Sequence, residues 1–195
     1  GTNFVSDWLL EGAAEDPRFE VAAIYSRLQD TANAFAEKHN IPHTFISLEK
    51  MASSPLIDAV YIASPTALHS EQAILFMEHG KHVLCEKPSA SNVRELGRMI
   101  EAAKKYDVVF MEAMKSTLMP GFKAVLQHLP EIGTVRRYFA SYCQYSSRYD
   151  KLKAGEVMNA FKPELSNGAV MDLGIYTIYP LVVLWGRPLG ISATG

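Results

Sequence analysis

The sequence has few cysteines and no large excess of charge of either sign. Its 195 residues include two cysteines, Cys85 and Cys143, far apart and outside any metal-ligand spacing. This excludes a disulfide framework and favours reduced thiols in a cytoplasmic protein. A net charge of −2 provides no electrostatic basis for binding nucleic acid or an anionic membrane surface.

Long apolar runs and metal-binding patterns are also missing. No run of about 18 consecutive apolar residues occurs, so no segment is expected to span a bilayer. The N-terminus lacks a basic region followed by an apolar block, so a secretory signal is not expected. His79 and His82 flank a predicted helix-to-strand turn, where a structural role is favoured over zinc, and no metal site is expected.

The first half of the chain alternates helical and strand patterns, which is typical of a parallel sheet covered by helices. Ser91 is expected to cap its clearest helix, with Val93, Leu96, Ile100 and Ala103 on one apolar face. The chain starts at a glycine turn rather than with the apolar strand that should precede it. We therefore predict an α/β fold, a Rossmann-type doubly wound parallel sheet over residues 1–117, with its first strand missing. Strands are predicted over 19–25, 59–63, 82–85 and 108–111, and helices over 5–15, 28–39, 66–79 and 91–106.

Residues 118–195 have a different pattern. A helix is predicted over 120–129, and the long, aromatic, roughly alternating segment 134–145 predicts a half-buried antiparallel strand. A further apolar helix is expected over 169–185, interrupted or bent near Pro180. Because one strand cannot form a stable sheet, we expect a truncated α+β domain with an open, mainly antiparallel sheet. The domain boundary is expected near Ser116 to Pro120.

The first candidate cofactor contact is the turn formed by Gly1, Thr2, Asn3 and Phe4. A glycine turn at a helix N-terminus lets backbone N–H groups approach a pyrophosphate. Only the first glycine of the usual pattern is present, and Asn3, which tolerates a left-handed backbone, stands at the second position. A frayed terminus is the alternative.

The second candidate contact lies at the end of the strand predicted over 19–25, which is the second strand of the expected Rossmann fold. NAD-binding folds usually carry an acidic residue there for the ribose, whereas this chain has Ser26 and Arg27. A hydroxyl and a forked guanidinium suit a 2′-phosphate, so NADP is favoured and NAD stays the alternative. The structural alternative is that Ser26 caps the next helix and Arg27 is solvated.

A third candidate site lies where the strand at 59–63 ends. Ser64, Pro65 and Thr66 form a turn at the carboxyl end of a strand, where open α/β sheets bind ligands, and either hydroxyl could face the cofactor. His69 falls in the first turn of the following helix. Taken alone, this histidine is better explained by a surface or packed position, but as part of this turn His69 is expected to contact the cofactor.

The fourth candidate site ends the strand at 82–85. A buried strand delivers Glu86 and Lys87 before Pro88, and two charges in such a place need a partner or a use. Lys87 could polarise a substrate oxygen, and Glu86 could orient that lysine or line the nicotinamide. A strand-end salt bridge is the alternative.

The fifth candidate site is in the last predicted helix. Asp172 and Tyr176 are four residues apart and share one helix face amid apolar neighbours. A tyrosine can donate a proton if a nearby cation such as Lys87 lowers its pKa. The alternative is a tyrosine that extends to the surface.

Together these segments resemble the glucose–fructose oxidoreductase/inositol dehydrogenase (Gfo/Idh/MocA) family. The most specific match is GKHVLCEKP, and the resemblance runs through essentially the whole chain. It is nearest to the dihydrodiol dehydrogenase-like branch, because Tyr176 stands where many members have histidine. The matching segments are the turn at Gly1, residues 64–66 with His69, residues 80–88, 111–113 and 132–135, and residues 168–176.

The resemblance implies an N-terminal Rossmann domain and a C-terminal sheet often used for dimerisation. It implies that Lys87 contacts the substrate hydroxyl, that the Lys87–Pro88 bond can be cis, and that Tyr176 is the acid/base. The expected activity is reversible NADP-linked oxidation of a secondary alcohol or hemiacetal of a sugar, polyol or cyclic diol, with Asp172 holding substrate hydroxyls. The expected state is a cytoplasmic homodimer or higher homo-oligomer without nucleic-acid or membrane partners. The alternatives are a regulatory protein that senses NADP(H) or a sugar, and an enzyme with tightly bound cofactor that shuttles hydride between two sugars.

Overall fold

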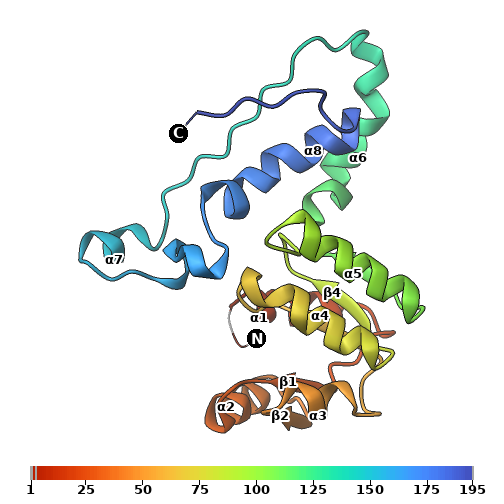
Figure 1. The fold of residues 1–195 in the computed structure, drawn as a ribbon, viewed down its shortest axis with the longest axis vertical. Coiled ribbons are helices and arrows are strands. Elements are labelled where there is room, and N and C mark those ends of the chain that lie inside the picture. The colour runs from red at the N-terminus through yellow and green to blue at the C-terminus, as the bar shows by residue number, and fades with distance from the viewer. Residues whose placement is uncertain (1, 3, 195) are drawn as a thin grey trace. The chain divides into compact units, whose positions relative to one another are not determined.

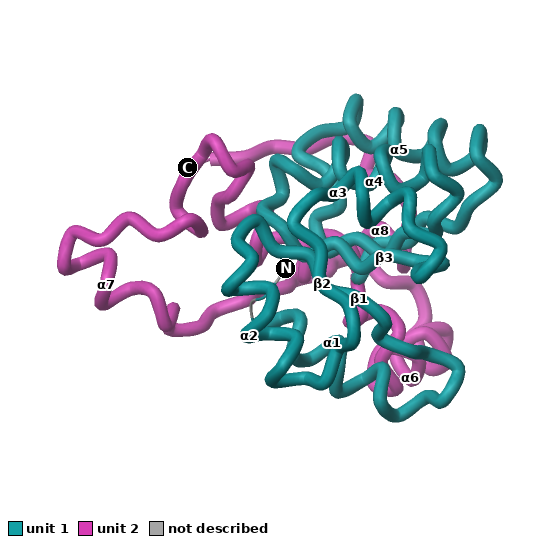
Figure 2. The backbone as a smooth tube through the Cα atoms, turned by 90° about the horizontal axis from the view of Figure 1, so that it is seen from below, with its two compact units in different colours: residues 1–113 teal, residues 114–195 magenta. Residues whose placement is uncertain are grey.

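The computed structural model describes residue 2 and residues 4–194 of the chain. The residues form two compact units, 1–113 and 114–195, which Figure 2 draws in teal and magenta. The limit between the units falls between Ala113 and Met114, slightly before the boundary expected from the sequence.

The first unit alternates strands with helices, as the sequence pattern predicts (Figure 1). Two short elements were not predicted, the strand β2 and the helix α3. The elements in order are α1 (Phe4–Ala14), β1 (Ala23–Tyr25), α2 (Gln29–His39), β2 (His43–Phe45), α3 (Leu48–Ala52), β3 (Ala59–Ile62), η1 (Thr66–Leu68), α4 (His69–Glu78), β4 (His82–Cys85), α5 (Val93–Lys105) and β5 (Phe110–Glu112).

The strands of this unit form two parallel sheets. One has the order β1-β2 and the other the order β3-β4-β5. In the standard dinucleotide-binding sheet the strands lie in the order 3-2-1-4-5-6. Its strands 2 and 3 correspond to the pair β1-β2, and its strands 4, 5 and 6 correspond to β3-β4-β5; strand 1 lies between these two groups. The predicted Rossmann-type α/β fold is confirmed.

The main core lies between the three-stranded sheet and its helices. Strands β3 and β4 bury alternate residues, because successive side chains of a strand point to opposite faces. Helices α4 and α5 pack against the strands and against each other, which leaves the carboxyl ends of the strands at one edge of this core. The buried residues of these four elements are Val60, Ile62, Ala73, Phe76, Met77, Val83, Cys85, Met99 and Ala102, together with His69 and Ser70.

Helix α5 differs from the prediction in its cap and its buried face. The Oδ1 atom of Asn92, not Ser91, accepts hydrogen bonds from the first-turn nitrogens, each at 3.1 Å. The helix buries Met99 and Ala102, whereas Val93 is 81% exposed and Ile100 is 41% exposed. Leu96 and Ala103 of the predicted face are partly buried, and Ala103 packs against the core, whereas Val93 and Ile100 were predicted wrongly, because the position of the neighbouring α4 decides which stripe of α5 is covered.

The turn between α4 and β4 requires its glycine. Gly80 has a φ of 71°, a left-handed conformation that costs little only without a Cβ. The N–H of Gly80 bonds to the carbonyl of Met77, and that of Lys81 bonds to Phe76, which ends the helix and starts β4. This geometry delivers the chain directly into the strand that carries Glu86 and Lys87 at its end.

The second unit consists of short helices and extended chain. Of its described residues only Met114 is buried. Its elements are η2 (Lys115–Leu118), α6 (Pro120–His128), η3 (Leu129–Ile132), α7 (Tyr149–Lys153), η4 (Asn159–Phe161), η5 (Pro163–Leu165), the π-helix η6 (Val170–Gly174) and α8 (Ile175–Trp185).

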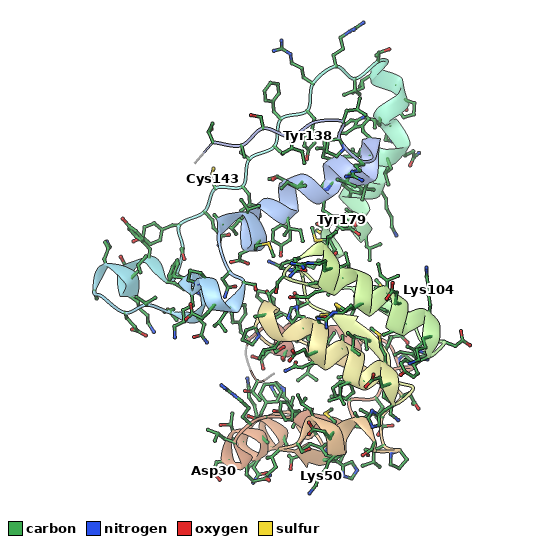
Figure 3. The ribbon with its side chains drawn as sticks, viewed as in Figure 1. Asp30, Lys50, Lys104, Tyr138, Cys143 and Tyr179 are labelled. Carbon is green, nitrogen blue, oxygen red and sulfur yellow. The ribbon has the colours of Figure 1, made fainter. Side chains whose placement is uncertain are left out.

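Two predictions for this unit were wrong, a paired strand over 134–145 and an interruption of the last helix at Pro180, whereas the alternative that Pro180 bends this helix stays a prediction. Residues 134–145 are extended but pair with no strand among the described residues; Tyr138 and Cys143 mark this segment in Figure 3. Alternating side chains signal an extended backbone but cannot supply the neighbouring strand that a ladder needs. Helix α8 runs through Pro180 without interruption, and the irregular turn is the π-helix η6 before it.

The stretch Pro163–Trp185 is long and apolar enough to cross a membrane, with a mean hydropathy of 1.5 in its most apolar window. The sequence shows no uninterrupted apolar run here because Glu164 and Asp172 lie within the stretch. One helix of this kind is weak evidence, because core helices of soluble proteins have the same composition. The absence of a membrane partner stays a prediction.

Candidate active site

The candidate site is the edge of the three-stranded sheet where its strands end. Register pairs Cys85 of β4 with Glu112 of β5, so Glu112 lies beside the end of β4. The N–H of Glu86 donates to the carbonyl of Ile62 at 2.9 Å, and the N–H of Ala113 donates to the carbonyl of Cys85 at 2.8 Å. The sheet thus holds the backbone immediately before Lys87 in a fixed position.

The Glu86 carboxylate is held from two sides. It accepts a short hydrogen bond from the Tyr61 hydroxyl, and its other oxygen accepts the backbone N–H of Lys87 at 3.2 Å. Burial raises the pKa of Tyr61, and the bond and the negative charge of Glu86 raise it further, so the phenol stays protonated and keeps donating. Of the two predicted roles for Glu86, orienting the lysine fits these contacts.

The turn after Lys87 is held by a second carboxylate. The Lys87–Pro88 peptide bond is cis, as the family resemblance implies. One oxygen of Glu112 accepts the backbone N–H of Ser89 at 2.8 Å and its hydroxyl at 3.0 Å. Glu86 and Glu112 therefore accept hydrogen bonds from the backbone immediately before and after the Lys87–Pro88 bond.

His69 connects this turn to the one that follows β3. Its Nδ1 lies 3.0 Å from the carbonyl oxygen of Pro88, and its Nε2 lies 2.8 Å from that of Ser64. The side chain is only 1% exposed, so the ring is packed inside the protein. In the same turn, the Ser64 hydroxyl donates to Gln72 at 2.8 Å, Thr66 is buried and Pro65 is partly buried.

Lys87 itself is partly exposed at the end of this framework. A lysine ammonium carries a positive charge and N–H groups that can donate hydrogen bonds. Such a group can polarise a substrate oxygen, and it can lower the pKa of a neighbouring hydroxyl.

Ser26 and Arg27 follow β1 at its carboxyl end. The N-cap residue of α2 is Leu28, without a side-chain cap, so the alternative that Ser26 caps this helix is wrong. Arg27 is exposed, and the backbone N–H of Ser26 donates to Phe45 of the neighbouring strand at 3.1 Å. A hydroxyl and a guanidinium at a strand end are chemically suited to a phosphate monoester.

The predicted glycine turn falls partly outside the described residues, which do not include Gly1 and Asn3. Thr2 is partly exposed, and Phe4 begins α1, where its ring contacts Trp8 edge-on with centroids 5.0 Å apart. The role of this turn in holding a pyrophosphate stays a prediction.

Asp172 and Tyr176 lie in the second unit. Asp172 is in the π-helix η6, and Tyr176 is in the first turn of α8, so they do not share a regular α-helix as predicted. Short π-helical turns occur frequently at functional sites. The Tyr176 ring stacks on Tyr142, with centroids 5.3 Å apart and an interplanar angle of 19°.

The structure thus brings the predicted residues Ser64, His69, Glu86 and Lys87 together within the first unit. Lys87 and Tyr176 belong to different units, and a shared cleft between them stays a prediction. Sequence reasoning did not assign Tyr61 and Glu112 to the site. An acidic residue ending β5, beside the end of β4, was the available signal for Glu112.

Comparison with known proteins identifies the family. The sequence pattern of the Gfo/Idh/MocA oxidoreductase family, which has an NAD-binding Rossmann fold, matches residues 1–114. The chain belongs to this family. The resemblance inferred from the sequence motifs is therefore confirmed.

Several relatives have assigned activities. The chain is 60% identical over its full length to scyllo-inositol 2-dehydrogenase (NADP(+)) IolU of Bacillus subtilis (strain 168), covering 60% of that protein. It is 36% identical to the trans-1,2-dihydrobenzene-1,2-diol dehydrogenase of Danio rerio, with 90% of this chain and 52% of that protein covered. The chain therefore spans little more than half the length of these relatives.

A solved structure has a similar fold. KijD10, a 3-ketoreductase from Actinomadura kijaniata crystallised with NADP, matches with a TM-score of 0.79 and 27% identity. The match covers 91% of this chain and 53% of KijD10.

Proposed function

We propose that this protein is an NADP-dependent oxidoreductase that interconverts a secondary alcohol and a ketone on a polyol or cyclic diol. The observation that carries the proposal is the Lys87 turn. Glu86 and Glu112 fix this turn by two hydrogen bonds to its backbone N–H groups and one to the Ser89 hydroxyl, at the ligand-binding edge of a dinucleotide-binding sheet. Membership of an oxidoreductase family, and relatives named for inositol and dihydrodiol dehydrogenation, support the same reaction class.

NADP is the cofactor that the chain's own residues fit best. Ser26 and Arg27 would hold the 2′-phosphate, and Ser64 and Thr66 would line the cofactor beside the Lys87 turn. Residues 1–4 would face the pyrophosphate. When bound, the nicotinamide supplies the hydride acceptor or donor.

The protein's part in the reaction is to position the alcohol and move its proton. The Lys87 ammonium donates a hydrogen bond to the substrate oxygen and stabilises negative charge on it. Tyr176 accepts the proton during oxidation and returns it during reduction. Asp172 accepts hydrogen bonds from other substrate hydroxyls.

We propose the cellular location, the oligomeric state and the absence of macromolecular partners from the composition and the family resemblance. The neutral charge balance and reduced cysteines suit a cytoplasmic enzyme, and the family resemblance favours a homodimer formed through a C-terminal sheet. Polyols are soluble small molecules, which need neither a nucleic-acid nor a membrane surface.

Substitution of Lys87 in the full-length protein tests the proposal. Lys87→Ala should lower kcat for polyol oxidation by about 100-fold or more, since general acid–base and electrostatic contributions are of that size. NADPH binding, followed by tryptophan fluorescence, should be nearly unchanged. Lys104→Ala, on the exposed side of α5, is the matched control.

A second variant tests the phenol. Tyr176→Phe should lower kcat while retaining NADPH binding, and the loss should be greatest at the pH where the wild type is most active. Unchanged turnover in Lys87→Ala, or a wild-type protein that binds NADPH but oxidises no polyol or diol, would overturn the proposed activity.

A further inference from the structure

His69 lies between two turns that the proposed function uses for different tasks. Its Nε2 contacts the carbonyl of Ser64, in the turn after β3 that faces the cofactor. Its Nδ1 contacts the carbonyl of Pro88, next to the lysine that faces the substrate. One side chain thus links both turns, although they are more than 20 residues apart in sequence.

The ring is too deeply buried to contact a ligand itself. It is 1% exposed, and both of its nitrogens face backbone oxygens at hydrogen-bond distance. This differs from the sequence-based expectation of a direct cofactor contact. A buried ring can affect a ligand only through the backbone that it holds.

The two contacts of the ring are not equivalent. Carbonyl oxygens only accept hydrogen bonds, and a neutral imidazole has one N–H to donate. Burial lowers the pKa of His69, while the two carbonyl contacts and the charges of Glu86 and Glu112 oppose this shift. In its neutral form the ring therefore donates to only one of the two carbonyls at a time, and its tautomer decides which turn it holds.

The ring is not what anchors its helix. His69 is the first residue of α4, and the helix is held in the core by Ala73, Phe76 and Met77, which are at most 1% exposed. The strand ends are fixed separately by backbone hydrogen bonds of the sheet. Loss of one ring contact should therefore loosen one turn and leave α4 in place.

We propose that His69 is a positioning residue that couples the cofactor turn at Ser64 to the catalytic turn at Pro88. The inference rests on the proposed function, because it assigns the two turns to NADP and to Lys87. The Nε2 contact sets the position of the cofactor turn, and the Nδ1 contact sets the position of Lys87.

Two amide variants separate the contacts. The amide nitrogen of asparagine lies close to the position of Nδ1, and that of glutamine lies close to the position of Nε2. His69→Asn therefore keeps a donor for Pro88 and loses the one for Ser64, whereas His69→Gln does the opposite. His79→Asn is the matched control, because His79 bonds to a carbonyl, that of Leu75, on the exposed end of the same helix.

The experiment measures kcat and the Kd for NADPH in the full-length protein. His69→Gln should lower kcat by about 10- to 100-fold, as expected for a misplaced catalytic group, with the Kd for NADPH changed less than about threefold. His69→Asn should raise the Kd for NADPH by about fivefold, the effect of one hydrogen bond, and change kcat less. The control should match the wild type in both quantities.

A second measurement needs no variant. In protein labelled with 15N histidine, the ring-nitrogen shifts of His69 should move on addition of NADPH, although the ring is buried, and those of His79 should not. A purely structural His69 would lower Tm in both amide variants without separating kcat from Kd, and its shifts would not respond to NADPH; either result overturns the inference.

The inference and the proposed function fail in different ways. If Lys87→Ala is inactive but the two amide variants change kcat and Kd in the same proportion, only the coupling role of His69 is wrong. If Lys87→Ala is fully active, the proposed function is wrong whatever the histidine variants do.

Discussion

Glu112 accepts two hydrogen bonds from Ser89 on a single carboxylate oxygen, from the backbone nitrogen at 2.8 Å and from the hydroxyl at 3.0 Å. The two residues come from different segments, since Glu112 ends β5 and Ser89 follows the Lys87–Pro88 bond after β4. The Glu112 carboxylate therefore acts as a clamp, because its hydrogen bonds hold Ser89 in place two residues after Lys87, the proposed catalytic lysine. This arrangement explains why a charged residue lies at the end of a strand whose neighbours are apolar.

Removal of this clamp should impair catalysis more than cofactor binding. Glu112→Ala leaves the Ser89 N–H without its charged acceptor, a loss worth about 1.5–3 kcal/mol. We expect a drop in kcat with little change in the Kd for NADPH. Ser89→Ala, which retains the backbone bond, should have a smaller effect on kcat, and equal effects of the two variants would contradict the clamp. Steady-state kinetics with the full-length protein provides the measurement.

Arg27 should decide between the two nicotinamide cofactors. Arg27→Ala removes a charge-assisted contact to a 2′-phosphate, which should raise the KM for NADP+ by about 10- to 100-fold. The KM for NAD+, which lacks this phosphate, should change little. Arg98→Ala, on the exposed face of α5, serves as control. An equal rise in the KM for NADP+ and for NAD+ would show that Arg27 does not recognise the 2′-phosphate.

His69 should make the stability of the protein dependent on pH on the acid side. Burial lowers its folded-state pKa below the value of about 6.5 for a histidine in the unfolded chain. Between these two pKa values the unfolded state binds more protons, so the stabilisation is present above about pH 6.5 and is lost as the pH falls through the folded pKa. Urea unfolding at a series of pH values should show a weaker pH dependence in His69→Asn than in the wild type. Identical slopes would indicate that other groups cause the acid lability.

The two cysteines should differ sharply in reactivity. Burial raises the pKa of Cys85 to about 12, and the charges of Glu112 and Glu86 add to this effect. Its thiol is therefore protonated and inert near neutral pH, whereas Cys143 is exposed. Iodoacetamide at pH 8 should modify Cys143 in the native protein and both residues in denaturant, as read by peptide mass spectrometry. Modification of native Cys85 at a similar rate would contradict the buried position.

The sequence by itself determined the alternation of helices and strands in the first unit and the chemistry placed at the strand ends. Both are local properties. The spacing of apolar residues indicates whether a segment buries its side chains as a helix or as a strand. Gly80 indicates a turn before β4, and the structure shows that this turn is left-handed. Ser64, Glu86 and Lys87 could be predicted as site residues for the same reason, because parallel strands end at one edge.

Only the tertiary structure decided which side chains and backbone groups form hydrogen bonds or pack against one another. Strand register brings Glu112 to Ser89 and Tyr61 to Glu86, and helix packing buries Met99 rather than Val93. The extended segment 134–145, which pairs with no strand among the described residues, likewise shows that a strand needs a neighbour distant in sequence. Hydrogen bonds and packing contacts act over a few ångströms, so partners separated by 20 residues or more become apparent only once the chain has folded.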